Sequence, residues 1–450
     1  TVAGCVLALD GDGKLLWNAN LKIPFSISPT VVDLLEDETP EVLALNQVGT
    51  LFCLSGKNGA QIWSFQLPGD IEWGTTAIAV SDLDGDNTPE IVTGTKQGQV
   101  VCISAQGSQK WVYQGEHGIT LSPAIGALGP DTPKSILISG TKLPLLCLDA
   151  QGKEQWRVKE AAKGAAPIIV DLDGDGNMEI LTGYDNAMMA VNGDGSVRWK
   201  LALTKETDSS LCVADADEDG IIEIYAIDLS GKLYAVSPMG QELWRADVVQ
   251  RARRNPAIAD IDGDDAIEIV VGGYDGQLHV FNAKGEPKET LNMGGTTNAA
   301  PVIACFGGDG RPSVLYASDK TELIALQWPE SKPEAKLAWG DYRYDAAHTG
   351  CYQPASAQSK VSVAEVDFGD FYVGQNKAYI FIQNYASAML HIETTVDTGE
   401  TQTTTADNND YGFLVTTKYT IPAQQPCNIT IRFDVYEGNT LVAHRSQRNY

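Results

Sequence analysis

The chain contains 450 residues, of which 43% are hydrophobic and 20% are charged. This length allows about two to four domains, and the composition excludes wholesale disorder and collagen-like repeats. Its 59 acidic residues outnumber 32 basic ones and give a net charge of −27, so we expect no nucleic-acid partner, because such a surface repels a phosphate backbone. No run of about 18 apolar residues occurs, so we expect no transmembrane segment in this chain.

A repeat of roughly 45 residues organises the chain from its start to about residue 340. One unit, residues 164–199, shows the short apolar segments APIIVD, MEILTG, AMMAVN and SVRWKL, the last of which runs just past the unit, with Gly, Asp or Asn between them. Such runs are typical of strands buried on both faces. Four antiparallel strands per repeat indicate the blades of a β-propeller. A Trp in the last strand should pack one blade on the next in the units of Trp17, Trp63, Trp111, Trp156, Trp199 and Trp244.

The number of blades depends on the incomplete first unit. Eight third strands are present but only seven first strands, because the opening segment TVAGCVLALDGDGKLLWN enters the repeat halfway. We predict an all-β fold with an eight-bladed propeller whose first blade is incomplete, and seven blades as the alternative. Residues Val2–Cys5 also match a lipoprotein cleavage box, but the repeat register explains them better.

The repeat ends near residue 340, and the character of the sequence then changes twice. Residues 341–360 form an aromatic and polar segment followed by a linker. From Val361 onward, apolar and polar residues alternate in strands such as KAYIFIQNY and CNITIRFDVY, which suits a small immunoglobulin-like β-sandwich. We therefore predict a propeller over 1–340, a connecting segment over 341–360 and a sandwich over 361–450.

An acidic nonapeptide joins the first and second strands of four repeats: DLDGDNTPE, DLDGDGNME, DADEDGIIE and DIDGDDAIE. Carboxylates stand at positions 1, 3, 5 and 9, and their mutual repulsion requires a cation nearby. Ca²⁺, which takes about 6–8 oxygen ligands, suits this cage better than zinc or copper. We predict about four calcium sites, with the ligands Asp82, Asp84, Asp86, Glu90, Asp171, Asp173, Asp175, Glu179, Asp215, Asp217, Asp219, Glu223, Asp260, Asp262, Asp264 and Glu268. Loop 33–41 loses position 3 to Leu35, and we expect no metal in loops 126–134 and 305–313.

These features resemble known families of repeats. The D-x-D-G-D-x-x-x-E loops resemble FG-GAP/VCBS repeats, and strings such as ALDGDGKLLW resemble PQQ-like repeats. The first resemblance implies calcium-binding propeller blades that mostly serve adhesion. In the tail, Val366–Gly369, Val373-Gly374 and IPAQQPCNITIRF resemble the ASH/choice-of-anchor immunoglobulin-like modules, which implies an interaction module. The PQQ quinoproteins usually carry adjacent cysteines near the quinone, and this chain has no such pair.

The connections between blades lie on the propeller face opposite the acidic loops. Basic and aromatic residues gather there, and we predict a ligand-binding set of Trp73, His117, Arg251, Arg253 and Arg254. Arginines bind the carboxylates of acidic glycans, and aromatic rings stack on sugars. A solvated loop paired with nearby acids is the alternative for the arginines. No spacing of Ser, His and Asp or of paired carboxylates stands out, so we predict no catalytic residues.

These observations together favour an extracellular protein, secreted or held at the cell surface, that binds a glycan or another protein without catalysis. The first alternative is a polysaccharide-active enzyme, a lyase, which uses the face that carries His117 and Arg254. The second alternative is a quinone-dependent dehydrogenase. A central pocket lined by His, Arg and Tyr favours an enzyme, whereas a flat or plugged centre favours binding.

Overall fold

The computed structural model contains β-strands, turns and loops, and no helix, among the residues that it describes. The chain divides into two compact units, one formed by Thr1–Leu172 and Met178–Tyr352, the other by Asp173–Asn177 and Gln353–Tyr450. The described residues are 4–25, 28–35, 37, 39–71, 77–130, 132–140, 142–158, 165–207, 210–248, 255–297, 299–305, 309–320, 323–333, 337–339, 348–349, 351–352, 361–367, 374–384, 390–396, 401–406, 412–421, 429–437 and 440–449.

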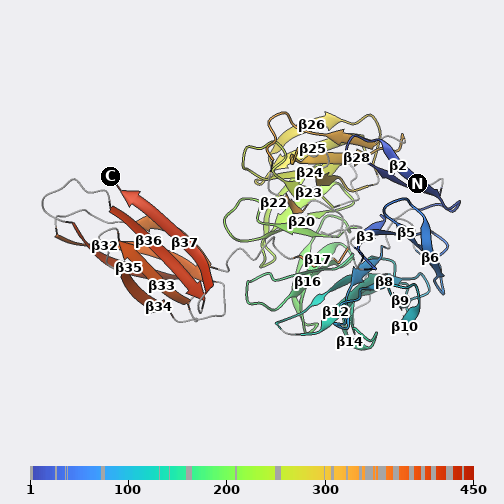
Figure 1. Cartoon of the computed structure of the whole chain (residues 1–450), viewed down its shortest axis with the longest axis horizontal. Helices are drawn as coiled ribbons and strands as arrows, with labels where there is room; N and C mark the ends of the chain where they lie inside the picture. Colours follow the sequence, from blue (N-terminus) through green and yellow to red (C-terminus); the bar gives the residue numbers. More distant parts are fainter. Residues whose placement is uncertain are drawn as a thin grey trace. The chain divides into compact units, whose positions relative to one another are not determined.

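The first unit is a seven-bladed β-propeller, and its blades follow one another in chain order (Figure 1). Most blades are antiparallel sheets of four strands. In chain order, the blades are β3–β6 (Thr30–Val32, Glu41–Leu45, Thr50–Ser55, Gln61–Gln66), β7–β10 (Ala79–Ser81, Glu90–Gly94, Gln99–Ile103, Gln109–Gln114), β11–β14 (Ala124–Ala127, Lys134–Gly140, Leu143–Asp149, Glu154–Arg157), β15–β18 (Ile168–Val170, Glu179–Gly183, Ala187–Asn192, Val197–Ala202), β19–β22 (Cys212–Ala214, Glu223–Ile227, Lys232–Val236, Glu242–Asp247), β23–β26 (Ala257–Ala259, Glu268–Gly272, Gln277–Asn282, Pro287–Asn292) and β27–β29 (Val302–Ala304, Ser313–Ala317, Leu323–Leu326).

The count of seven blades is the alternative that the repeat left open. The incomplete opening unit forms a two-stranded sheet, β1 (Cys5–Leu9) with β2 (Leu15–Asn20), because it contributes only a third and a fourth strand. This sheet packs on the first blade, where Trp17 joins a core that includes Val42 and Leu54. Cys5 pairs with Asn20 as part of the sheet, in agreement with the repeat register.

How deeply a strand is buried depends on its position in the blade. Second strands such as β16 and β20 are buried at every residue, because neighbouring blades cover both of their faces. Fourth strands such as β10 and β22 alternate between exposed and half-buried residues. First strands of adjacent blades contact one another, as β7 and β11 do, and β11 and β15. The first strands therefore surround the central channel, and the fourth strands form the outer edge.

The repeated Trp packs one blade on the next, as the sequence predicts. The indole Nε1 of Trp111 donates to the carbonyl oxygen of Ala150 in the next blade at 3.0 Å. The indole ring lies over Gly152, where an added Cβ would meet a ring carbon at 2.5 Å. Gly152 also has a φ of +77°, so this turn needs glycine for its backbone and for its close contact. The other five units repeat this hydrogen bond, with Trp17, Trp63, Trp156, Trp199 and Trp244 as donors.

The central channel contains a later part of the same chain. Strand β30 (Leu337–Trp339) adds antiparallel to β23, the first strand of the sixth blade. Farther on, the backbone N–H of Ile125 in β11 donates to the carbonyl oxygen of Thr349, and the N–H of Tyr352 donates to that of Ile169 in β15, both at 2.8 Å. The described parts of 337–352 therefore line the inner strands of several blades.

Two side chains show how closely this axial segment is packed. His348 is only 3% exposed, and its Nδ1 lies 2.9 Å from Oγ1 of Thr30 in β3. Cys351 is also buried, and a Cβ on Gly126 of β11 would approach its Sγ to 2.8 Å. Glycine at position 126 is what lets Cys351 fit against the blade. The propeller unit accordingly extends to Tyr352.

The second unit is all-β. It contains a three-stranded sheet in the order β31-β32-β35 and a four-stranded sheet in the order β34-β33-β36-β37, all antiparallel. The strands are β31 (Val361–Asp367), β32 (Gly374–Asn384), β33 (Leu390–Val396), β34 (Thr401–Ala406), β35 (Gly412–Ile421), β36 (Ile429–Glu437) and β37 (Thr440–Asn449), drawn in orange to red in Figure 1. Two antiparallel sheets with crossed-over strand order suit the predicted sandwich.

Candidate metal centres

The four acidic loops share one backbone design. The position 9 glutamate opens the second strand, is buried, and accepts the backbone N–H of position 2, as Glu90 does from Leu83 at 2.8 Å. The position 1 aspartate accepts N–H groups from within the loop, as Asp82 does from Gly85 at 2.8 Å and from Asn87 at 3.0 Å.

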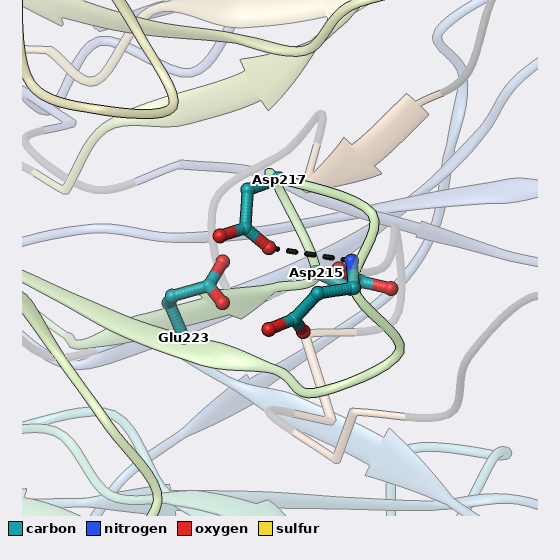
Figure 2. A group of neighbouring side chains, drawn as sticks. Asp215, Asp217 and Glu223 are labelled. Atoms are coloured by element: carbon teal, nitrogen blue, oxygen red, sulfur yellow. Dashed lines mark hydrogen bonds between the residues drawn. The ribbon is translucent and has the colours of Figure 1, made fainter.

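Each of the four loops brings carboxylates together, but the loops differ in how many. In one loop, ligand oxygens of all four predicted residues, Asp215, Asp217, Asp219 and Glu223, lie within 4.8 Å of one another. Figure 2 shows Asp215, Asp217 and Glu223 around a common space. The other loops gather three each: Asp82, Asp84 and Asp86; Asp171, Asp173 and Glu179; Asp260, Asp262 and Glu268. Glu90, Asp175 and Asp264 stand outside these sets.

Basic side chains enter three of the loops. Nζ of Lys110 lies 2.8 Å from Asp84 and 2.6 Å from Glu90. Nζ of Lys288 lies 2.8 Å from Asp262, 2.9 Å from Asp264 and 2.8 Å from Glu268. In the loop 171–179, Arg198 pairs with Glu179 at 3.0 Å. The acidic pattern of the loops does not predict these cations.

The lysines change the acidity of the loops that they enter. The hydrogen bond from Lys110 lowers the pKa of Asp84, and the bond from Lys288 lowers the pKa of Asp264. Burial still raises the pKa of Glu268, although Lys288 contacts it. In these loops, therefore, an ammonium group offsets the repulsion among the outer carboxylates.

Among the residues that the structure describes, no Lys or Arg pairs with the four clustered carboxylates of loop 215–223, Asp215, Asp217, Asp219 and Glu223. Oδ1 of Asp215 is buried without a hydrogen-bond partner. Burial raises the pKa of Asp215 and brings the pKa of Glu223 to about 7, with the neighbouring carboxylates adding to both shifts. Glu223 accepts hydrogen bonds from the N–H of Ala216 at 2.9 Å and from the hydroxyl of Tyr225 at 3.1 Å. This loop is a cage of oxygens that a hard divalent cation would neutralise.

The remaining loops differ from this design. In loop 33–41, Leu35 stands at position 3, and its N–H donates to Glu41 at 3.2 Å. In the third blade, Ala127 pairs with Lys134, and the loop between these two residues has the bounds 128–133. In the fourth blade, Val170 pairs with Glu179, and the loop between them has the wider bounds 171–178. The loop of the third blade is therefore shorter, and a lysine replaces its glutamate. In loop 305–313, described in part, Cys305 stands at position 1.

The predicted ligand face is described only in part. His117 lies exposed in the connection between β10 and β11, and its carbonyl oxygen lies against Gly98. Trp73, Arg251, Arg253 and Arg254 lie outside the described residues. The described residues therefore do not test whether these five side chains lie together, and the ligand face stays a prediction.

Blades, packing tryptophans and clustered carboxylates together define a β-propeller with acidic loops on one face. A family model described as the lambda-carrageenase beta-propeller domain matches residues 1–70 and 178–297. No curated protein matches the chain. In the part of the chain that the structure describes, no helix has the length and hydrophobicity needed to cross a membrane.

Two solved structures share the propeller fold. BamB from Moraxella catarrhalis is 17% identical and superposes with a TM-score of 0.54, over 73% of this chain and 90% of that chain. BBS1N, crystallised in complex with ARL6DN, is 11% identical with a TM-score of 0.50, over 74% of this chain and 99% of that chain. At these identities, the likeness concerns the fold alone.

Proposed function

We propose that this protein is a calcium-stabilised, non-catalytic propeller that binds an acidic glycan or a protein outside the cell. The observation that carries the proposal is the axial segment, because β30 and residues 348–352 hydrogen-bond to inner strands where an axial substrate or quinone would have to enter. A propeller with a filled centre presents its loops, rather than a central pocket, to a partner. The position of β30 on the inner strands disfavours a quinone-dependent dehydrogenase.

Calcium is part of the proposal because the acidic loops require a counter-charge. Position 9 glutamates such as Glu223 are buried, and a buried carboxylate is costly unless a cation or hydrogen bonds offset it. Metal bound only by the folded loop stabilises the fold by mass action. Extracellular calcium modules work with Kd values of about 10⁻⁴–10⁻³ M, which fits a site of carboxylates and backbone oxygens outside the cell.

Metal analysis tests the calcium part of the proposal. After equilibrium dialysis against buffer that contains about 1 mM calcium, the upper end of that Kd range, we expect at least one calcium ion per chain, with loop 215–223 occupied. Replacement of Asp217 by Ala should remove one of them, since Asp217 belongs to the four-carboxylate set. Protein that contains no calcium, and whose melting temperature is the same in calcium and in EDTA, would refute the structural role.

The ligand face is tested by an array of acidic and neutral glycans probed with the full chain in calcium. We expect binding to acidic glycans, since charge-assisted hydrogen bonds contribute about 1.5–3 kcal/mol when shielded. Arg254→Ala should weaken that binding at least about tenfold, a change of about 1.4 kcal/mol. Arg245 on the outer strand β22 pairs with Glu242, and Arg245→Ala is the matched control that should bind as the parent does. Equal loss in both variants would exclude the predicted face.

A polysaccharide-active enzyme is the second candidate, and the match to the lambda-carrageenase propeller model favours it. The test is incubation of the chain with carrageenan, followed by measurement of new reducing ends and of the ultraviolet absorbance of unsaturated products. New reducing ends with unsaturation would indicate a lyase, and reducing ends alone a hydrolase. Binding without either product supports the non-catalytic proposal.

A further inference from the structure

In each of the first six blades, the fourth strand carries a β-bulge at the same position. In β10, Gln109 pairs with Ile103 and Trp111 pairs with Cys102, so Lys110 is the extra residue between them. In β26, Pro287 pairs with Phe281 and Glu289 with Val280, which leaves Lys288 as the extra residue. A bulge commonly re-aims a side chain, and here each bulge lysine reaches the acidic loop of its own blade.

From this geometry we propose that the bulge residue decides how each acidic loop is neutralised, and that Lys110 and Lys288 are tethered cations that take the place of calcium. The inference rests on the proposed calcium binding of loop 215–223 and extends it to a rule for the other blades. A lysine at the bulge holds the loop closed without metal. An apolar residue at the bulge leaves the loop dependent on a free divalent ion.

The contacts of Lys288 resemble those that a metal would make. Its Nζ contacts carboxylates from positions 3, 5 and 9 of one loop, Asp262, Asp264 and Glu268, all within 2.9 Å. The Glu268 side chain is only 1% exposed, so this ion pair supplies the counter-charge at the buried end of the loop. Lys110 repeats the arrangement with Asp84 and Glu90, and the Glu90 side chain is 3% exposed.

The fifth blade provides the natural comparison. Its bulge lies between Glu242, paired with Val236, and Trp244, paired with Ala235. The extra residue is Leu243, which is 52% exposed and carries no charge. The loop of this blade is the one that gathers four carboxylates and contains the unpartnered Oδ1 of Asp215. The same backbone position therefore carries a cation in three blades (Lys110, Arg198 and Lys288) and the uncharged Leu243 in the fifth blade.

The tether explains why lysine competes well with a dissolved ion. Attachment to the neighbouring strand gives the ammonium a high effective concentration at the loop, whereas calcium must be captured from solution. Calcium carries a greater charge than the ammonium group, so it can still displace the lysine from loops 82–90 and 260–268. Because the lysine is tethered, this displacement should need a high calcium concentration. The rule therefore predicts two classes of loop in one propeller.

Reciprocal substitutions in the full chain test the rule. Lys288→Met removes the ammonium but keeps a similar apolar stem, and we expect this variant to bind one calcium more than the parent after dialysis. Its melting temperature should fall in EDTA and recover in calcium. Leu243→Lys, at an exposed site that tolerates a polar side chain, should bind one calcium fewer than the parent and lose sensitivity to EDTA. Lys332→Met, which breaks an exposed pair with Asp265 beside the same loop, is the control and should match the parent in both measurements.

The outcomes separate this rule from the proposed function. If the parent and all variants bind no calcium, the proposed function fails. The tethered cation is still supported in that case if Lys288→Met melts at a temperature well below that of Lys332→Met in EDTA. If Lys288→Met and Lys332→Met have the same calcium content and the same melting temperature in EDTA, the rule is overturned. Unchanged calcium content in Leu243→Lys also overturns it when the parent binds calcium, and this variant decides the question if Lys288→Met does not fold.

Discussion

The acidic loops of the fifth and sixth blades have nearly the same sequence pattern and opposite electrostatic states. Both place aspartates at positions 1, 3 and 5 and a buried glutamate at position 9. In the sixth blade, Lys288 contacts three of these carboxylates, whereas in the fifth blade Leu243 occupies the same bulge. A loop motif alone therefore does not define a metal site. The residue at the bulge of the fourth strand decides whether the loop already has a cation: Lys288 supplies one in the sixth blade, and Leu243 supplies none in the fifth.

The largest difference should appear when the buried glutamates are removed. Glu268→Ala in the sixth blade should destabilise the fold by about 2–4 kcal/mol, because it leaves Lys288 with fewer partners and Ile261 without its acceptor. In EDTA, Glu223→Ala should cost less, since it also removes repulsion from a loop without a cation. Urea unfolding of both variants in EDTA measures this difference, and equal losses would contradict the comparison.

Chelation should have the next largest effect, and it should act on the fifth blade. If calcium is present at about 100 times its Kd, its removal costs about 2.7 kcal/mol of unfolding free energy. The melting temperature should therefore fall in EDTA, and the fall should be smaller in Asp217→Ala because that variant has already lost a ligand. An EDTA effect of full size in Asp217→Ala would place the responsible calcium elsewhere.

A pH effect should distinguish the two loops in the absence of calcium. The pKa of Glu223 is raised to about 7, above its ordinary value, so the folded state holds this proton more tightly than the unfolded state. This contribution to stability is present at low pH and is lost as the pH rises toward and through 7. In EDTA, the melting temperature should therefore rise as the pH falls from about 8 to about 5.5.

Two controls sharpen the pH measurement. Glu223→Gln should flatten the pH dependence between about 5.5 and 8, since the amide does not titrate there. In saturating calcium the dependence should weaken or reverse, because the metal binds the ionised carboxylates. A profile in EDTA that is the same in the parent and in Glu223→Gln would show that another group causes it.

The smallest effect should come from the exposed pair beside the sixth loop. Lys332 and Asp265 lie 3.1 Å apart, and their side chains are 54% and 81% exposed. Exposed ion pairs contribute about 0–1 kcal/mol, so Lys332→Met should change the unfolding free energy by less than about 0.5 kcal/mol. A loss as large as that of Glu268→Ala would mean that proximity to the loop, rather than burial, decides the contribution of a cation.

Much of the propeller could be predicted from the sequence because the information is local and repeated. Four short apolar runs per unit, the Trp of the last strand and the turn glycine such as Gly152 recur at one spacing, and the structure shows the packing that they predict. The repeat leaves both eight and seven blades open, because the unit of β1 and β2 contributes a third and a fourth strand without a first and a second. Seven blades form, and the remaining pair packs on the first of them.

The acidic loops show both the reach and the limit of local patterns. Their spacing correctly predicts that carboxylates gather, since three or four oxygens meet in each of the four loops. The bulge lysines were missed, although a signal exists: Lys110 and Arg198 directly precede the repeated Trp in units whose acidic loop is complete. Recognition of that signal requires knowing that a bulge in the fourth strand turns this residue toward the loop.

By itself, the sequence determined the all-β repeat, the order of strands in a blade, the packing role of the tryptophans and the clustering of acids at one end of the blades. These features depend on residues close together in the chain, so periodicity and turn chemistry specify them. Only the tertiary structure decided which loops contain a lysine and that Leu337–Trp339, Thr349 and Tyr352 return to the inner strands. Both depend on contacts between segments far apart in the sequence, and such contacts exist only once the blades have closed around their axis.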